Sequence, residues 1–200
     1  MPREPETVRI VKYPHPTLRH PSKPLRRVDA ELKKFVAEMF ELMYEHRGIG
    51  LAANQVDLPY QFFIVNVTGD KAAKEEEHVL INPMIVKRDG NIEADEGCLS
   101  LPDIFAPVRR SERIVATAYT LTGEEKQYDV DGMLARVIQH EYDHLEGKLF
   151  IDRISPANML NVKESLAEME LEFDGDRRRG VIPDDRQIVA RLSKLEALRA

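Results

Sequence analysis

The pattern of apolar positions predicts one long amphipathic helix in the first quarter of the chain. Its apolar stripe recurs at the three- and four-residue spacing of a core-facing α-helix. The members of the stripe are Leu32, Phe35, Val36, Met39, Phe40 and Met43. Asp29 is a suitable N-cap, and Gly48 is expected to end the helix as its C-terminal cap.

Short apolar runs rich in β-branched and aromatic residues predict strands. The predicted strands cover residues 8–12, 61–67, 78–86, 114–121 and 127–130. Asn82-Pro83 interrupts the third of these and indicates a bulge or an edge strand, because proline has no N–H to donate. Four prolines between residues 14 and 24 favour an extended passage, in which His15 and His20 are expected on the surface.

The last third of the chain reads as helical. Asp131 caps a helix that runs to Gly147, and a charged helical segment then extends to about Phe173. Residues 174–186 read as a polar linker, and a final amphipathic helix follows. Its apolar residues are Ile188, Val189, Leu192, Leu195 and Leu198.

The order of these elements predicts an α+β fold, in which antiparallel or mixed sheets pack around a central helix and a C-terminal helix follows. We expect residues 1–155 to form the catalytic part and residues 156–200 to be a helical extension of the same domain.

Composition narrows the function classes. The chain has 200 residues and a net charge of −6, which argues against an overall electrostatic footprint for sequence-specific nucleic-acid binding. It contains no apolar run long enough to span a membrane, and its first ten residues lack the apolar region of a secretory signal. The single cysteine, Cys98, cannot form an internal disulfide, which fits a reducing compartment.

The strongest chemical signal is His-Glu-x-x-His at residues 140–144, on the predicted central helix. Positions four apart lie on one face of an α-helix, so His140 and His144 can hold one metal ion. Two imidazole nitrogens suit Zn, Fe, Ni or Co, and a third protein ligand leaves one position open. Glu141 is then placed to act as acid and base at that open position.

The third ligand is open from the residues alone. A histidine three residues after Gly147 would complete one protease pattern, but Phe150 stands there. Cys98, which follows a glycine, is one candidate. The other is a glutamate of the later charged helix, as in a second protease arrangement, and its members are Glu164, Glu168, Glu170 and Glu172.

Three segments closely resemble the signature motifs of the peptide deformylase family, and they occur in the family's order. They are Gly-Ile-Gly-Leu-Ala-Ala-Asn-Gln at 48–55, Glu-Gly-Cys-Leu-Ser at 96–100 and Gln-His-Glu-Tyr-Asp-His-Leu-Glu-Gly at 139–147. The similarity runs from about Val8 to Ser155. It implies an enzyme that removes the N-formyl group from N-formylmethionyl nascent peptides and releases formate.

The resemblance also implies roles for individual residues. Cys98, His140 and His144 would be the ligands of ferrous iron, which zinc, nickel or cobalt can replace. Glu141 would be the catalytic acid and base. The oxyanion would be held by Gln55 and by the backbone N–H of Leu99, and Gly50 would bind the peptide backbone.

The resemblance places a methionine-sized pocket beside the metal. Met133, Arg136 and Val137 precede His140 on its own helix and are expected to line this pocket, with the stem of Arg136 in the wall and its charged head in water. Ile49 would close the other wall.

Two departures from the family pattern stand out. Asn54 replaces a threonine that many relatives carry, and Phe105 replaces an arginine that some relatives place near the peptide.

Two other functional classes remain open at this point. One is a metal-dependent endopeptidase with a glutamate ligand, and the other is a metal-free binding module in which the motifs have outlived the activity. For the deformylase, we expect a cytoplasmic, bacterial-type protein, with an organellar location also open. Its partners would be nascent peptides and the ribosome near the nascent-chain exit, with no membrane.

Overall fold

The computed structural model describes residues 8–200. Two expectations concern residues 1–7 and lie outside the described residues. They are that the domain starts at residue 1 and that the first residues are not a secretory signal. Within residues 8–200, no helix is long and apolar enough to cross a membrane.

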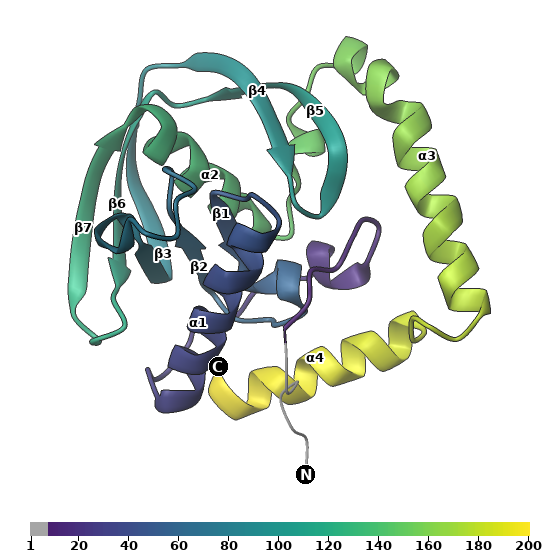
Figure 1. Cartoon of the computed structure of the whole chain (residues 1–200), viewed down its shortest axis with the longest axis horizontal. Coiled ribbons are helices and arrows are strands. Elements are labelled where there is room, and N and C mark those ends of the chain that lie inside the picture. The colour runs from purple at the N-terminus through teal and green to yellow at the C-terminus, as the bar shows by residue number, and fades with distance from the viewer. Residues whose placement is uncertain (1–7) are drawn as a thin grey trace.

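Two antiparallel sheets form the β part of the fold, which confirms the predicted α+β class (Figure 1). The larger sheet has the strand order β1-β2-β3-β6-β7. Its strands are β1 (Gly50–Ala52), β2 (Phe62–Val65), β3 (His78–Asp89), β6 (Arg113–Tyr119) and β7 (Glu125–Asp131). The smaller sheet is the hairpin of β4 (Ile92–Cys98) and β5 (Leu101–Arg110). The predicted bulge is present, since the β3–β6 register shifts between Ile81 and Met84.

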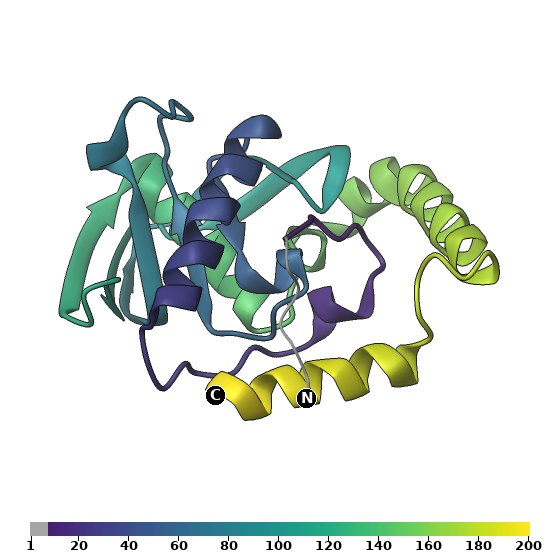
Figure 2. The same cartoon turned by 60° about the horizontal axis from the view of Figure 1, so that its bottom comes forward.

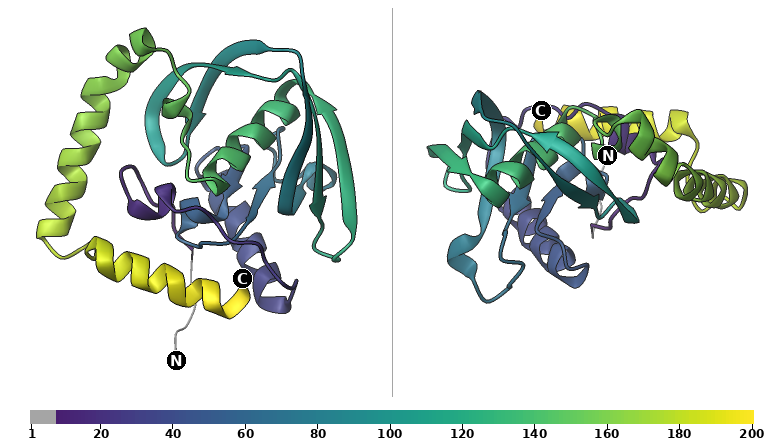
Figure 3. Two further views of the ribbon diagram at one scale, coloured as in Figure 1. Left: turned by 180° about the vertical axis from the view of Figure 1, so that it is seen from behind. Right: turned by 90° about the horizontal axis from the view of Figure 1, so that it is seen from above.

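Helices α1 (Ala30–Glu45) and α2 (Gly132–Leu145) cover opposite faces of the larger sheet. Alternate residues of β2 show this, because Phe62 and Ile64 pack in the cluster of α1 whereas Phe63 and Val65 pack in the cluster of α2. Seen from behind, α2 lies between the larger sheet and the β4–β5 hairpin (Figure 3). The predicted central helix is therefore confirmed.

The start of α1 is as predicted, but its end is not. Asp29 accepts a hydrogen bond from the Leu32 N–H, as an N-cap does, at 3.0 Å. The helix ends at Glu45, and Arg47 takes the left-handed backbone conformation with φ of 56°. Gly48 is required for space instead, since an added Cβ would lie 2.6 Å from Leu99 Cδ1.

The N-terminal passage also differs from the sequence expectation. Residues 8–12 form no strand, although the Val11 N–H donates to the Gln55 carbonyl and the Tyr13 N–H to the Ser100 carbonyl. His15 is 6% exposed, not on the surface, and its ring lies edge-on to Phe173. The partner of His15 is 158 residues later in the chain, so local sequence gave no sign of its burial.

The C-terminal arm consists of α3 (Pro156–Arg178) and α4 (Asp185–Arg199). Helix α3 runs through Gly175, so the predicted linker at 174–186 is wrong and the connection is only the short segment between the two helices. Helix α4 turns back beneath the body, as Figure 2 shows. Of the five apolar residues of this helix, Ile188, Leu192 and Leu195 are buried, whereas Val189 and Leu198 are 48% and 40% exposed.

Candidate metal centre

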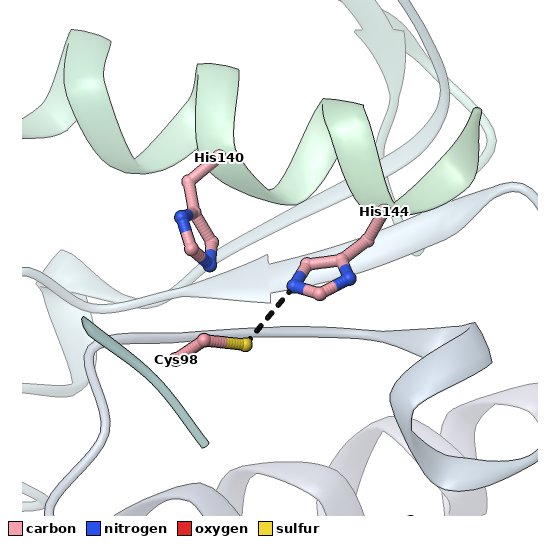
Figure 4. A group of neighbouring side chains, drawn as sticks. All are labelled: Cys98, His140 and His144. Carbon is pink, nitrogen blue, oxygen red and sulfur yellow. Dashed lines mark hydrogen bonds between the residues drawn. The ribbon is translucent and has the colours of Figure 1, made fainter. Parts of the chain in front are cut away.

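Cys98, His140 and His144 come together at the junction of the hairpin and the central helix (Figure 4). Cys98 is the last residue of β4, and the two histidines lie one turn apart on α2. Their ligand atoms all lie within 4.8 Å of one another, and Cys98 Sγ is 3.3 Å from His144 Nε2. Within residues 8–200 this is the one such group of three His, Cys, Asp or Glu side chains.

This donor set fits a tetrahedral divalent metal. Metal–nitrogen bonds of about 2.0–2.1 Å and a metal–sulfur bond of about 2.3 Å place ligand atoms roughly 3.3–3.6 Å apart. The Cys98–His144 separation of 3.3 Å already has this value. One thiolate and two imidazoles leave a fourth position open, which is the arrangement of a catalytic rather than a structural site.

A carboxylate fixes the orientation of His140. Glu96 Oε2 lies 2.9 Å from His140 Nδ1, so that nitrogen donates its proton and Nε2 carries the free lone pair. Burial alone would raise the pKa of Glu96, but hydrogen bonds from Arg110 and His140 hold the pKa of this carboxyl well below its usual range. Glu96 therefore stays ionised and keeps its hold on the imidazole.

Glu96 belongs to a buried ionic network that joins the hairpin to α2. Arg110 donates to both Glu96 oxygens, at 2.9 and 2.8 Å, and also binds Asp143. Asp143 in turn pairs with Arg153. Each buried charge has an opposite partner, as burial in a low dielectric requires.

Arg136 is where the sequence expectation fails most clearly. Its head group was expected in water above a substrate pocket, but the side chain is buried and turned toward the hairpin. Nη1 lies 2.7 Å from Glu96 Oε1. The reason is electrostatic, because the guanidinium forms charge-assisted hydrogen bonds with the ionised Glu96 and with strand carbonyls in place of hydrogen bonds with water.

Glu141 is buried beside the metal group without being part of it. Its Oε2 has no hydrogen-bond partner within the part of the chain that the structure describes. Burial raises the pKa of Glu141 to about 7. Helix and strand touch here, because a Cβ added to Gly50 would lie 2.5 Å from Glu141 Oε1 and 2.7 Å from Val137 Cγ1.

Gln55 contacts the thiol of Cys98. Its Nε2 donates to Cys98 Sγ at 3.3 Å and to Ser100 Oγ at 3.2 Å, while its Oε1 accepts from the Ala52 N–H at 2.8 Å. Leu99 directly follows Cys98 in the chain. Asn54, beside Gln55, donates to the His144 carbonyl and thereby ties this segment to α2.

The residues expected to line a pocket are only partly brought together. Val137 is buried against Gly50, and Ile49 packs in the same apolar cluster. Met133 lies one helical turn before Val137, at the start of α2, and is 56% exposed. Phe105 is 66% exposed, and its ring covers Gly97, where an added Cβ would lie 2.4 Å from the ring.

The structure removes the glutamate-ligand alternative. Glu164, Glu168, Glu170 and Glu172 lie on α3, and none belongs to the metal group. Glu170 accepts a hydrogen bond from the Tyr13 hydroxyl at 2.6 Å instead. The endopeptidase interpretation therefore loses its third ligand.

The sequence analysis did not identify the polar residues that support the site. Glu96 and Arg110 were given no role, although Glu96 begins one of the three motifs. Their partners lie 14 to 44 residues apart in the chain, so neither periodicity nor spacing reveals them. The position of Glu96 within a motif was the only available signal.

Comparisons with known proteins all point to one family. A family model described as polypeptide deformylase matches residues 7–159. The peptide deformylase of Rhodopirellula baltica is 42% identical over 189 residues, which is 94% of either chain. That of Neisseria gonorrhoeae is 42% identical over 161 residues, covering 80% of this chain and 95% of its own.

Solved structures agree with the sequence relatives. A plant peptide deformylase superposes with a TM-score of 0.84 at 38% identity, over 92% of this chain and 98% of its own. The peptide deformylase of Plasmodium falciparum gives a TM-score of 0.82 at 36% identity, over 84% and 98% of the two chains. From the matched family model, these relatives and the shared fold, it follows that the chain belongs to the polypeptide deformylase family.

Proposed function

We propose that this protein hydrolyses the formamide of N-formylmethionyl nascent peptides, releasing formate and a free amino terminus. One observation carries the proposal at the level of residues. Cys98 meets His140 and His144, while Glu141 stands beside them as a buried carboxyl that is not a ligand.

The proposed resident metal is Fe(II), held by Cys98, His140 and His144, with zinc, nickel or cobalt as replacements. A divalent ion at this position supplies Lewis acidity, polarising a carbonyl oxygen and lowering the pKa of water. The thiolate of Cys98 brings one negative charge to the site, and the two imidazoles bring none.

Glu141 is the proposed general base and acid. A group of this kind works best when its pKa lies near the working pH, and burial raises the pKa of Glu141 to about 7. It takes a proton from the attacking water and delivers a proton to the leaving amine. Its unpartnered Oε2 is free to do so.

Gln55 and the Leu99 N–H are the proposed donors to the developing oxyanion. The Gln55 amide is preorganised, because its Oε1 is anchored by the Ala52 N–H at 2.8 Å and Nε2 therefore faces Cys98. Fixed donors of this kind stabilise charge without reorganising during the reaction.

The methionine side chain is proposed to lie against Ile49, Met133 and Val137. Val137 sits one turn of helix before Glu141, so an apolar chain lying on it is close to the acid and base. Gly50 lets the peptide backbone and α2 approach β1 closely, since any side chain there would meet Glu141 and Val137. Arg136 takes no part in this wall, because its head group points into the hairpin.

The test is formate release from formyl-Met-Ala-Ser by protein purified without air, with its metal content measured in parallel. We expect iron in the active preparation, activity that decays in air, and air-stable activity after nickel or cobalt substitution. Iron protein that keeps full activity in air for days would contradict the assignment of Fe(II). Absence of formate release with every one of these metals would contradict the proposed reaction.

We further propose that the protein works in the cytoplasm near the ribosomal nascent-chain exit, where its substrates emerge. Residues 156–200 are proposed to be an extension of one catalytic domain. Co-sedimentation with ribosomes carrying a formylated nascent chain tests the location. Sedimentation that is unchanged from that of an unrelated protein of the same size would contradict it.

A further inference from the structure

Arg136 joins the central helix to both strands of the hairpin. It lies on α2 one turn before His140, and its guanidinium is buried against β4 and β5. Nη1 donates to Glu96 Oε1 at 2.7 Å and to the Val108 carbonyl at 3.0 Å. Nη2 donates to the Ile92 carbonyl at 2.9 Å. Nη1 also donates to the Ala94 carbonyl at 3.5 Å, so one side chain holds two neighbouring strands at four points.

The hairpin needs such a link, because it is not hydrogen-bonded as a strand to the five-stranded sheet. Cys98 is carried by this hairpin, whereas His140 and His144 are carried by α2. The distance between the thiol and the imidazoles therefore depends on how the hairpin docks on α2. Within residues 8–200, the buried arginines that cross this junction are Arg136, from the helix side, and Arg110, from the strand side.

The two arginines do different work. Arg110 binds both oxygens of Glu96 and reaches Asp143, so it connects charge to charge. Arg136 adds contacts to backbone carbonyls of β4 and β5, which fix the position of the strands themselves. Only a planar fork with several donors can serve a carboxylate and carbonyls of two strands at once.

We propose that Arg136 is a positioning residue for the metal site. It pins the hairpin so that Cys98 meets the two imidazoles, and through Glu96 it keeps His140 with Nε2 free. This inference rests on the proposed metal site at Cys98, His140 and His144. It assigns to Arg136 a role in metal geometry in place of contact with substrate.

Substitution at Arg136 leaves the Glu96 carboxylate paired. In Arg136→Met, Glu96 keeps Arg110 and the His140 ring as partners, so no buried carboxylate is left unpaired. Methionine also fills much of the space of the arginine stem. What is lost is the set of strand contacts, and loss of a group that supports a ligand typically lowers metal affinity about 10- to 100-fold.

The experiment measures zinc and cobalt affinity of the metal-free full-length chain by competition with a chelator, together with the cobalt absorption spectrum. Arg136→Met is expected to weaken binding about 10- to 100-fold and to change the cobalt–thiolate absorption. Arg136→Lys keeps one charge for Glu96 but fewer donors, so its affinity should fall between those of the parent and Arg136→Met. The matched control is Arg109→Met on the same hairpin, whose side chain is exposed, with parental affinity expected.

The possible results distinguish failure of the proposed metal site from failure of the role of Arg136. If Cys98→Ala binds metal as tightly as the parent, the proposed metal site fails. If Cys98→Ala loses metal but folded Arg136→Met keeps parental affinity and spectrum, only the role of Arg136 is overturned. The role would also be overturned if Arg136→Met binds metal more weakly but keeps the parental cobalt spectrum, and Arg136→Lys binds no more tightly than Arg136→Met. Should Arg136→Met fail to fold, parental affinity and spectrum in Arg136→Lys would overturn the role.

Discussion

The metal centre and the C-terminal arm are held in place by different physical means. Around the metal centre, α2, β1 and the hairpin are in close contact, and buried ion pairs tie them together. The arm contacts the body along one face, and much of α3 is exposed, with Leu160 at 72% and Leu171 at 69%. Its far end is anchored by Arg199, which pairs with Asp29, the N-cap of α1, and with Glu31 in its first turn.

Changes in the two regions should therefore affect different measurable properties. A change at the metal centre moves ligands or the acid and base, so it should alter metal content or turnover. A change in the arm removes buried apolar area and an anchor without touching a reacting group, so it should alter stability. We therefore expect a division in which the metal centre determines activity and the arm contributes stability.

Glu141→Gln should lower turnover of formyl-Met-Ala-Ser by about 10²- to 10⁴-fold, because the amide cannot carry the proton. The fold and bound metal should remain, since Glu141 is not a ligand. Formate release and metal content of the same preparation provide the check. Glu146→Gln, an exposed glutamate at the end of the same helix, is the control and should behave like the parent. Loss of metal from Glu141→Gln would contradict the assigned role.

Gly50→Ala should lower turnover by about 10- to 100-fold while metal is retained. The new methyl group would lie 2.5 Å from Glu141 Oε1, so the carboxylate must move. Small displacements of reacting groups are costly to rate. A lower turnover number in steady-state kinetics, together with parental metal content, would support this interpretation. Unchanged kinetics would show that Glu141 has room to adjust.

Truncation after Arg178 removes α4 and should lower the melting temperature by about 10 °C, because three buried apolar side chains lose their contacts. Turnover per folded, metal-loaded molecule should stay within about twofold of the parent. Calorimetry and active-site-normalised kinetics give the two numbers. A finer version compares Leu192→Ser, which is buried, with Val189→Ser, which is 48% exposed, and only the first should destabilise. If folded truncated protein loses turnover, the arm shapes the site and the division fails.

The ion pair at the end of the arm should add a small, pH-dependent stability. Burial alone would raise the pKa of Asp29, but the Leu32 N–H and Arg199 outweigh it and lower the pKa from 3.8 to about 2. Because the folded pKa is the lower one, the contribution is present above about pH 4 and is lost as pH falls toward 2. Asp29→Asn keeps a good N-cap and removes the charge.

We expect Asp29→Asn to lose about 1 kcal/mol or less of unfolding free energy at pH 7, and this difference from the parent should vanish near pH 2. Urea unfolding at several pH values measures it. A difference that grows as the pH is lowered would have the wrong sign for this pair.

Local sequence patterns predicted the scaffold of the site but not its supports. The helix that carries His140 and His144 follows from periodicity and spacing, and the cap at Asp29 follows from residue type. Neither strand of the β4–β5 hairpin was predicted. Pro102 and Pro107 interrupt the second strand, and its pairing with β4 is the only evidence for it. Arg136 was misplaced because its partner Glu96 lies 40 residues away, and only the folded chain shows that the two meet.

The arm was predicted less well for a related reason. Gly175 and a run of charged residues read as a linker, yet α3 continues to Arg178. Aromatic contacts at this end explain the difference, because the ring of Phe173 packs on His15 and the Arg177 guanidinium lies 4.6 Å from its centroid. These contacts outweigh the roughly 1 kcal/mol that a helical glycine costs.

Cys98 is proposed to be a metal ligand together with His140 and His144, and the metal content of Cys98→Ala is the decisive measurement. We expect this variant to fold, to retain little metal after purification and to release no measurable formate, because two imidazoles alone hold a divalent ion weakly. Ser100→Ala is the matched control, since Ser100 shares the hydrogen bond from Gln55 but is not in the metal group, and it should keep its metal. Full metal occupancy in folded Cys98→Ala would contradict the role of Cys98 as a ligand.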